Sequence, residues 1–214
     1  MRPHPILFGA AYSVYVRAVR LALAEKGVPY DLVEVDVFAA AGPPADYLQR
    51  HPFGRIPAFE HDGFRLYEST AIERYVDEAF VGPKLQPAEA MARARLNQIT
   101  SILDNYAYRP LVWDIYVERI SAPKEGRAGD EGRIAAAVPH AALCLKTIED
   151  LMGENTWLAG PEISLANLHA APMIAYAVMA PEGLDLLQAR ARLWAWWERL
   201  LRRPSVAAVI AAGA

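Results

Sequence analysis

The spacing of apolar residues divides the chain into two parts. Up to about residue 80, short apolar runs alternate with helical patterns, whereas beyond residue 87 only the three- and four-residue spacing of helices recurs. The segment 81–87 between them contains two prolines and a glycine, which is typical of a connection. The pattern therefore predicts an α/β domain over 1–80, a linker over 81–87 and an all-helical domain over 88–214.

The first domain is expected to begin β-α-β and to end in two further strands and a helix. Apolar and small residues after Ser13 recur at helical spacing until Lys26-Gly27, and residues 30–37 alternate with the period of a half-buried strand. The predicted elements are strand 6–8, helix 13–26, strand 30–37, a short helix at 46–50, strands 56–60 and 64–67, and a helix from residue 68.

The second domain is expected to contain helices only. They are predicted over 88–120, 133–152, 164–178 and 189–201, with a short helix after Pro204. The connection 121–132 is rich in charged residues, glycine and proline, so we expect a solvated loop there.

The composition excludes several classes of protein. Of 214 residues, 54% are hydrophobic and 22% are charged, as in a fully folded chain. A net charge of -3 without a massed basic segment argues against a nucleic-acid partner. The first residues lack the apolar run of a signal peptide, and no stretch approaches the roughly 20 apolar residues of a membrane span. We therefore expect a cytoplasmic protein without a membrane partner.

The cysteine and histidine content limits the possible chemistry. Cys144 is the only cysteine, so neither an internal disulfide nor a metal site of paired cysteines can form. The five histidines show neither metal-ligand spacing nor a Ser/His/Asp arrangement. We therefore expect no metal, and any thiol chemistry requires a sulfur from a second molecule.

Pro57 opens one of the expected strands, where it removes a hydrogen-bond donor. One interpretation is an ordinary trans proline, since only about 5–6% of X-Pro bonds in folded proteins are cis. The other is a cis Ile56-Pro57 bond that turns the Ile56 backbone outward, toward an extended peptide ligand. The residues alone leave both interpretations open.

Two serines stand where helices are expected to begin. Ser69, directly after Glu68, suits the binding of a carboxylate at the helix N-terminus, but it also suits a simple N-cap. Ser13 allows the same two interpretations, and Val16 at the third following position gives it no capping-box partner.

These residues belong to a longer pattern. It comprises Phe8–Ser13, Glu25–Tyr30, Pro52–Phe59 and Tyr67–Ile72 in the first domain, and Trp157–Gly160, Ser164–Asn167 and Arg202–Ser205 in the second. Over nearly its whole length the chain resembles the cytosolic glutathione transferases of the serine-dependent, phi-like group. The most specific part is the combination of Arg55-Ile56-Pro57 with Glu68-Ser69. The resemblance implies a thioredoxin-like first domain, an all-helical second domain and a homodimer.

The resemblance also implies roles for single residues. Pro57 becomes a cis-proline, and the backbone of Ile56 pairs with the cysteinyl part of glutathione. Glu68 and Ser69 hold the γ-glutamyl end, and Ser13 donates a hydrogen bond to the sulfur. Glutathione is then the co-substrate, and the reaction joins its thiolate to a hydrophobic electrophile, as in detoxification.

A hydroxyl at a helix start suits this chemistry. A free thiol with a pKa of about 8.5 is mostly protonated at neutral pH, whereas the thiolate is the nucleophile. Lowering the pKa by roughly two units requires about 2.7 kcal/mol. A charge-assisted hydrogen bond of ~1.5–3 kcal/mol and a helix-dipole contribution of ~0.3–1 kcal/mol supply this. Tyr12 and Tyr15 remain alternative donors.

The chain departs from the family pattern in several places. The loop 38–45 lacks the Lys or His that pairs with the glycyl carboxylate of glutathione in relatives. Arg55 stands in place of a Gln, and either supplies this charge or is a surface arginine. His51, in place of an Asn, is a second candidate. Asn167 replaces an Asp of a buried capping motif and is still expected to cap.

The electrophile is expected to bind between the domains, beside aromatic side chains that suit flat apolar molecules. The expected residues are Tyr12, Tyr106, Tyr108, Arg109, Trp113 and Tyr116, and the alternative for each is helix packing. Two other functions stay open. One is a binding or regulatory module without transfer activity, which the cation-free loop favours, and the other is a glutathione-dependent peroxidase, dehalogenase or isomerase.

Overall fold

The computed structural model describes residues 4–40 and 42–211. By the density of internal contacts the chain divides into two compact units. The first extends to Leu85 and also includes the residues from Ala207 onward, and the second comprises Gln86–Val206.

The first unit is built on a four-stranded mixed sheet. Its elements are β1 (Ile6–Phe8), α1 (Val14–Glu25), β2 (Asp31–Val33), the 3-10 helix η1 (Tyr47–Gln49), β3 (Ala58–His61), β4 (Phe64–Tyr67) and α2 (Ser69–Ala79). The strand order is β2-β1-β3-β4, with β1 parallel to β2 and the other two pairs antiparallel. This arrangement confirms the expected order of elements and is that of a thioredoxin-like domain.

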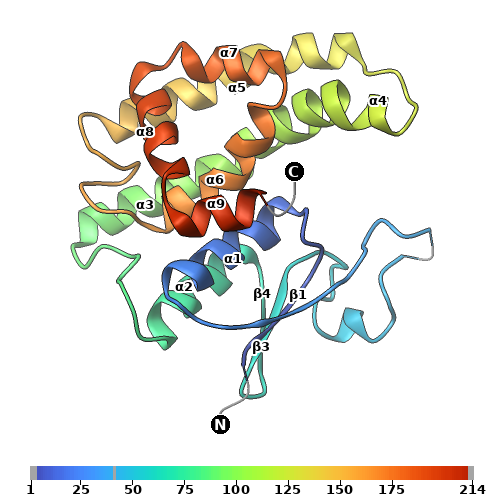
Figure 1. Cartoon of the computed structure of the whole chain (residues 1–214), viewed down its shortest axis with the longest axis vertical. Coiled ribbons are helices and arrows are strands. Elements are labelled where there is room, and N and C mark those ends of the chain that lie inside the picture. Colours follow the sequence, from blue (N-terminus) through green and yellow to red (C-terminus); the bar gives the residue numbers. More distant parts are fainter. Residues whose placement is uncertain (1–3, 41, 212–214) are drawn as a thin grey trace. The chain divides into compact units, whose positions relative to one another are not determined.

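The parallel pairing of β1 with β2 explains the position of α1. Parallel strands require a crossover connection, and a helix supplies it here. Figure 1 shows α1 and α2 next to each other on the same side of the sheet. The faces that they turn inward carry fully buried side chains, including Leu21, Leu23 and Ile72, so burial of apolar surface holds the helices in place.

β2 is shorter than the alternation of residues 30–37 predicts. Only Asp31–Val33 pair with β1, because β2 lies at the edge of the sheet and has a neighbour on one side only. After it the chain turns, and Val35 packs with Phe8, Tyr47 and Ala58 in a small core cluster.

A buried ion pair ties the ends of α1 and α2 together. The Lys26 ammonium donates to the Asp77 carboxylate (3.2 Å), to the Asp77 main-chain oxygen (2.9 Å) and to the Pro83 oxygen (3.0 Å). The same carboxylate accepts the N–H of Leu85 at 2.8 Å. Because the buried charge has these acceptors, its removal from water is compensated.

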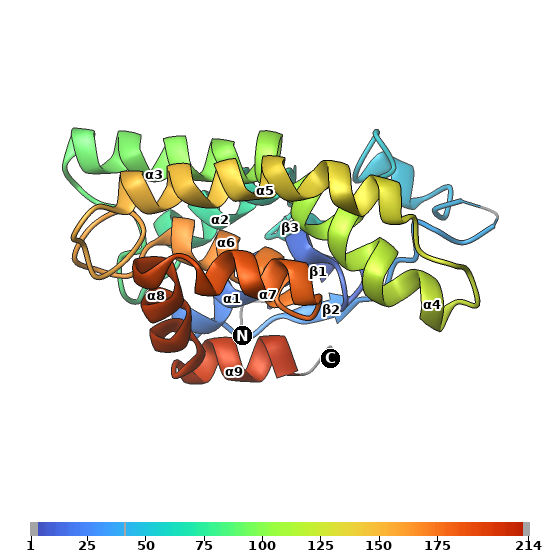
Figure 2. The same cartoon turned by 90° about the horizontal axis from the view of Figure 1, so that it is seen from above.

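The second unit is helical. Its elements are α3 (Ala90–Ile102), the π-helical stretches η2 (Leu103–Ala107) and η3 (Arg109–Ser121), α4 (Ala122–Lys124), α5 (Glu131–Met152), α6 (Leu165–Ala177), α7 (Pro181–Gln188) and α8 (Ala191–Leu201), and α9 (Pro204–Ala211) spans the division between the units. Seen from above, α3 and α5 run alongside each other (Figure 2). No described helix is long and apolar enough to cross a membrane.

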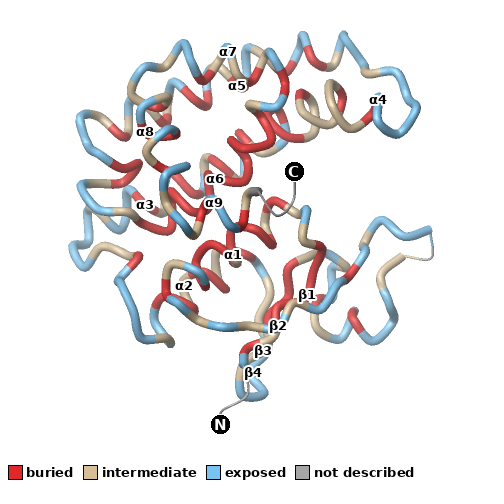
Figure 3. Tube along the Cα trace, in the orientation of Figure 1, coloured by how far each residue is buried: buried red, intermediate tan, exposed pale blue. Residues whose placement is uncertain are grey.

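α6 forms the centre of this unit. Every one of its residues is buried, so its trace is red throughout in Figure 3. Asn167 near its start donates to the Ser164 hydroxyl (3.0 Å) and accepts from the Leu158 N–H (3.0 Å) and the Trp196 indole (2.8 Å). The expected capping of α6 is not seen, because its N-cap Ser164 makes no side-chain capping bond. The Asn167 amide instead joins the start of α6 to Leu158 and to Trp196 of α8.

Three segments of the second unit differ from the sequence-based expectation. The predicted helix 88–120 is α-helical only to Ile102 and then π-helical, with Pro110, which has no N–H to donate, near the start of η3. The short helix α7 was not predicted. The connection after Ser121 is not simply solvated, because the short helix α4 begins it and charged side chains hold it.

These charges centre on Glu118, a buried residue of η3. Its carboxylate accepts from Arg127 (2.6 Å), Arg133 (2.8 Å) and the Asp130 N–H (3.2 Å). The hydrogen bond from Arg127 lowers the pKa of Glu118, although burial opposes the shift. The Glu118 carboxylate therefore holds the connection between η3 and α5 in place.

Candidate functional site

Gly9 brings two parts of the expected site into close approach. It follows β1 directly, with φ of 151°, and a Cβ built on it would lie 2.5 Å from Val16 and 3.2 Å from the Cβ of Ile56. Only glycine permits this contact without displacement of its neighbours. The first turn of α1, which follows Ser13, therefore lies against the segment that contains Ile56.

Ser13 is the N-cap of α1. Its hydroxyl oxygen accepts a hydrogen bond from the Val16 N–H, and the distance of 3.5 Å is long for such a bond. Capping uses a lone pair of the oxygen and leaves the hydroxyl hydrogen available for another acceptor. The two interpretations of Ser13 are thus compatible, since one side chain can cap the helix and donate to a ligand.

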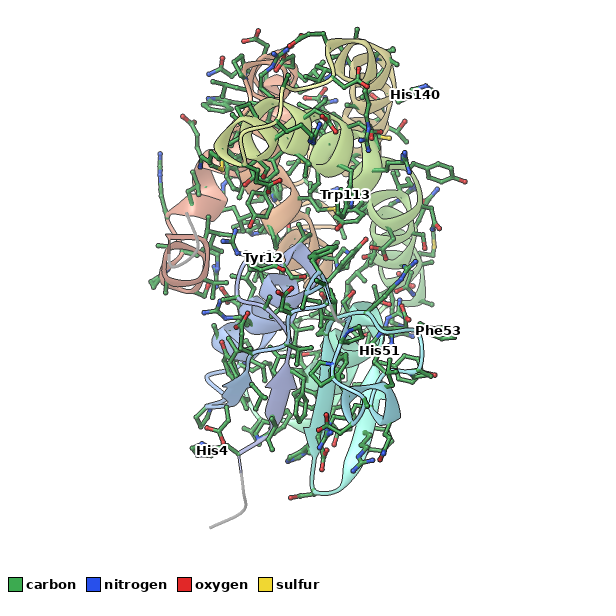
Figure 4. The ribbon with its side chains drawn as sticks, turned by 90° about the vertical axis from the view of Figure 1, so that its right-hand side faces the viewer. His4, Tyr12, His51, Phe53, Trp113 and His140 are labelled. Atoms are coloured by element: carbon green, nitrogen blue, oxygen red, sulfur yellow. The ribbon has the colours of Figure 1, made fainter. Side chains whose placement is uncertain are left out.

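Tyr12, the alternative donor, has a different environment. Partial burial and the carboxylates of Asp36 and Glu34 raise the pKa of its phenol. These negative charges disfavour a second anion close by, so they favour Ser13 over Tyr12 as the partner of a thiolate. Figure 4 labels Tyr12 near the start of α1.

The Ile56-Pro57 peptide bond is cis, as the family resemblance implies. Ile56 makes no backbone hydrogen bond with another described residue, so its N–H and C=O are open to an extended ligand. The preceding carbonyl, of Arg55, accepts a 2.6 Å hydrogen bond from Tyr47. Burial of Tyr47 raises the pKa of this phenol, which keeps it in its donating form.

Glu68 and Ser69 occupy the start of α2. Glu68 has φ of 71°, a conformation that costs a residue other than glycine roughly 1–3 kcal/mol and that is concentrated at functional sites. It is the N-cap without a side-chain capping bond, and Ser69 is the first helical residue and is buried. The first intrahelical bond runs from Ile72 N to Glu68 O, so the N–H groups before Ile72 have no partner within the helix. This arrangement suits an anion at the helix end.

Arg55 and His51 lie close to this turn but differ in exposure. The Arg55 side chain is exposed and makes no hydrogen bond or ion pair with any described residue. His51 is buried, and both Glu68 and Arg55 are near enough to influence its pKa. In the loop 38–45, where residue 41 is not described, the sequence offers no cation. Arg55 is therefore the more accessible of the two candidate partners for a carboxylate.

The residues expected at the electrophile site do not share one face of the second unit. Tyr106 and Arg109 line a cavity of about 760 Å³ beside α5, together with His140 and Cys144. Tyr116 instead stacks on Tyr176 of α6, with ring centroids 4.3 Å apart. Tyr108 and Trp113 are half-buried on the same helical segment, and Trp113 is labelled in Figure 4.

Neither the cavity nor the cysteine provides an obvious reaction centre. The cavity contains none of the residues expected to bind glutathione. Burial raises the pKa of the Cys144 thiol, which makes it a poor nucleophile. Among the described residues no cluster of His, Cys, Asp and Glu is arranged to hold a metal ion.

Sequence reasoning missed two residues that shape the site. Tyr47 is the buried first residue of η1, and its phenol reaches the Arg55 carbonyl eight residues later. Tyr176 lies in the predicted helix 164–178, and the spacing of that helix does not reveal that its ring stacks on Tyr116. A buried tyrosine needs a partner for its hydroxyl, which was the one available signal for Tyr47.

Two family models match the chain. Residues 7–84 match the family model of the glutathione S-transferase N-terminal domain, and residues 83–204 match that of the glutathione S-transferase C-terminal domain. The chain belongs to the glutathione transferase family. The two matches together extend from β1 to the start of α9.

Several plant glutathione transferases resemble the chain over most of its length. Glutathione S-transferase 3 of Zea mays is 31% identical over 208 residues, which are 96% of this chain and 93% of that protein. Glutathione S-transferase F13 of Arabidopsis thaliana is 29% identical over 201 residues, 93% of this chain and 91% of that protein. These relatives confirm the resemblance to the phi-like group.

Solved glutathione transferase structures share the fold. Glutathione transferase F7 from Populus trichocarpa superimposes with a TM-score of 0.86 at 31% identity, covering 98% of this chain and 99% of that one. Maize glutathione S-transferase I, in complex with an atrazine glutathione conjugate, gives a TM-score of 0.87 at 26% identity, with 98% of each chain covered. The α/β first unit and the helical second unit are thus those of a glutathione transferase.

Proposed function

We propose that the protein is an enzyme that joins the thiolate of glutathione to a hydrophobic electrophile. Family membership carries this proposal, because the matched relatives are named glutathione S-transferases and one of the similar structures holds a glutathione conjugate. The local geometry supports it, because three features suit the binding of a peptide that carries a thiol. They are the helix-capping Ser13, the backbone of Ile56 before the cis bond, and the start of α2 at Ser69.

In the proposed complex each part of glutathione has its own partner. The Ile56 backbone pairs with the cysteinyl unit, Glu68 takes the ammonium, and Ser69 with the α2 N-terminus takes the carboxylate of the γ-glutamyl end. Ser13 donates to the sulfur and, with the α1 N-terminus, favours its ionised form. Arg55 is the candidate for the glycyl carboxylate.

The electrophile is proposed to contact Tyr12 and the aromatic side chains of the second unit. Tyr108, Trp113 and Tyr116 are the better candidates, because Tyr106 and Arg109 lie on the cavity beside α5. A flat apolar molecule suits such rings. Cytoplasmic detoxification is the role proposed for this activity.

A glutathione titration by calorimetry tests the proposal. The wild-type chain should bind glutathione with a dissociation constant of about millimolar or below, and Ser69→Ala should bind more weakly because one donor to the carboxylate is lost. Ser101→Ala, an exposed serine of α3, is the matched control and should bind like wild type. A wild-type constant far above millimolar would favour a non-catalytic module instead.

We also propose that the protein is a homodimer. The apolar residues Ile72 and Val76 of α2 are fully buried, so they give no exposed surface for such an interface. Met91, Tyr106 and Leu143 are better support, since they expose large apolar side chains on the second unit. Light scattering should give the dimer mass, and a monomer at micromolar concentration would exclude the proposal.

A further inference from the structure

His51 has a buried polar atom without a partner. The residue follows η1, where its N–H donates to the Tyr47 oxygen (3.1 Å) and its oxygen accepts from Gly54 N (2.9 Å). Only 2% of the residue is exposed, and its Nδ1 has no hydrogen-bond partner among the described residues. Buried polar groups are nearly always hydrogen-bonded. No hydrogen bond at Nδ1 holds the ring in place, so its contacts with neighbouring rings must do so.

The ring lies against the turn that precedes α2. His51 stacks on Tyr67 with centroids 4.8 Å apart and planes at 34°, and Phe53 meets both rings edge-on at 6.2 and 6.1 Å. Figure 4 labels His51 and Phe53 on the same part of the first unit. Tyr67 ends β4, and the next residue is Glu68 with its positive φ. Such a backbone persists only where its surroundings hold it, and the three rings provide this support.

Two charged groups influence the His51 ring. Burial lowers the pKa of His51 most, Glu68 opposes this shift and Arg55 adds to it, so the ring is neutral at pH 7. The other residues that contact it, Tyr67 and Phe53, carry no charge at this pH. Glu68 is the one acidic group among the described residues that raises the pKa of His51, so its carboxylate would attract a proton on this ring.

We propose that His51 is a positioning residue for the turn that binds the γ-glutamyl end of glutathione. Its neutral ring supports Tyr67 and keeps Glu68 in the positive-φ conformation, and its protonated form attracts the Glu68 carboxylate away from the glutathione ammonium. The inference rests on the proposed function, which assigns Glu68 and Ser69 to glutathione. Two effects of pH are then expected. Protonation of His51 weakens the binding of glutathione, and protonation of the bound thiol, whose pKa depends on Ser13, lowers the rate of the reaction.

The test measures KM for glutathione and kcat between about pH 5.5 and 8. In the wild type, KM should rise as the pH falls, approaching about tenfold per pH unit below the His51 pKa. His51→Phe keeps an aromatic ring but has no titratable nitrogen. Its KM should therefore not change with pH and should stay close to the value of the wild type at pH 8. His51→Ala removes the support and should raise KM about fivefold or more at every pH. The fall of kcat with pH should be the same in all variants.

His61→Phe is the matched control. His61 belongs to the same unit, and its ring contacts the Tyr75 hydroxyl at 2.9 Å and not the turn before α2. This variant should keep the wild-type rise of KM at low pH.

A flat KM in the wild type would overturn the inference even if no variant folds. It would also fail if His51→Phe kept the wild-type rise, or if His51→Ala kept the wild-type KM. Absence of glutathione binding by the wild-type chain at every pH would refute the proposed function itself, which is a different result.

Discussion

Replacement of Ser13 by alanine tests the proposed thiolate donor. The change leaves the backbone of the α1 start in place, including the bond from Arg17 N to the Ser13 oxygen at 2.9 Å. The capping bond that is lost, from Val16 N, is 3.5 Å long, so the stability loss should lie near the lower end of the ~0.5–2 kcal/mol range for N-caps. The variant should therefore fold, with a Tm lower by only about 1–3 °C.

The effect on the bound thiol should be larger. Loss of a charge-assisted hydrogen bond of ~1.5–3 kcal/mol raises the thiol pKa by about one to two units. If the pKa moves from about 6.5 to about 8, the thiolate fraction at pH 7 falls from about three quarters to about one tenth. Turnover at pH 7 should then fall about tenfold. Above about pH 9 the difference should nearly disappear, because both thiols are ionised there.

The assay follows thiolate absorbance and the conjugation of chlorodinitrobenzene across this pH range. Tyr12→Phe is the matched control, because it removes the neighbouring hydroxyl, whose environment disfavours an anion. Glutathione affinity should change little in either variant. If Ser13→Ala keeps wild-type turnover while Tyr12→Phe loses it, the donor is the tyrosine and the role assigned to Ser13 is wrong.

Three further predictions concern groups outside the site. The pKa of Glu118 is lowered in the folded chain, so its charge stabilises the fold above its usual value of 4.5, and this contribution is lost as the pH falls through the lowered pKa. As the pH falls from 4.5 toward the lowered pKa, the Tm of wild type should therefore drop more steeply than the Tm of Glu118→Gln, and parallel curves would contradict this. Lys26→Met should destabilise the fold by about 3–5 kcal/mol in urea unfolding, because it removes the ammonium that is paired with the buried Asp77 carboxylate. The double variant with Asp77→Leu should recover part of the loss; no recovery would show that the ion pair is not the cause. Burial raises the pKa of Cys144, so its native thiol should react with iodoacetamide far more slowly at pH 8 than the thiol of the unfolded chain, and equal rates would exclude a protected thiol.

The elements that the sequence predicts well are those with strong local signals. α1 begins and ends where Ser13 and Lys26-Gly27 indicate, and the hairpin of β3 and β4 follows the turn at Asp62-Gly63. The length of β2 is hard to predict from sequence, because the extent of an edge strand depends on its single partner strand. α7 is hard to predict because it is only eight residues long. Local periodicity contains neither kind of information.

The features of the site that the sequence could predict are those that depend on the type of one residue and its place in an element. The cis bond at Pro57 belongs to this kind, and it is confirmed. The contacts of Tyr47 with the Arg55 carbonyl and of His51 with Tyr67 arise from chain segments folded onto each other. Their spacing along the sequence has no period that would reveal them, so they required coordinates.

The missing side chain of Gly9 has a consequence for engineering. Because a Cβ there would overlap Val16 and press on Ile56, any larger residue would push the start of α1, which follows the proposed thiolate donor Ser13, away from the segment that contains Ile56. A library aimed at new thiols or electrophiles should therefore keep position 9 invariant and place its diversity at exposed positions such as Tyr12 and Arg55. Variants at those positions would change which ligands bind, whereas variants at Gly9 would change the distance between the start of α1 and the segment that contains Ile56.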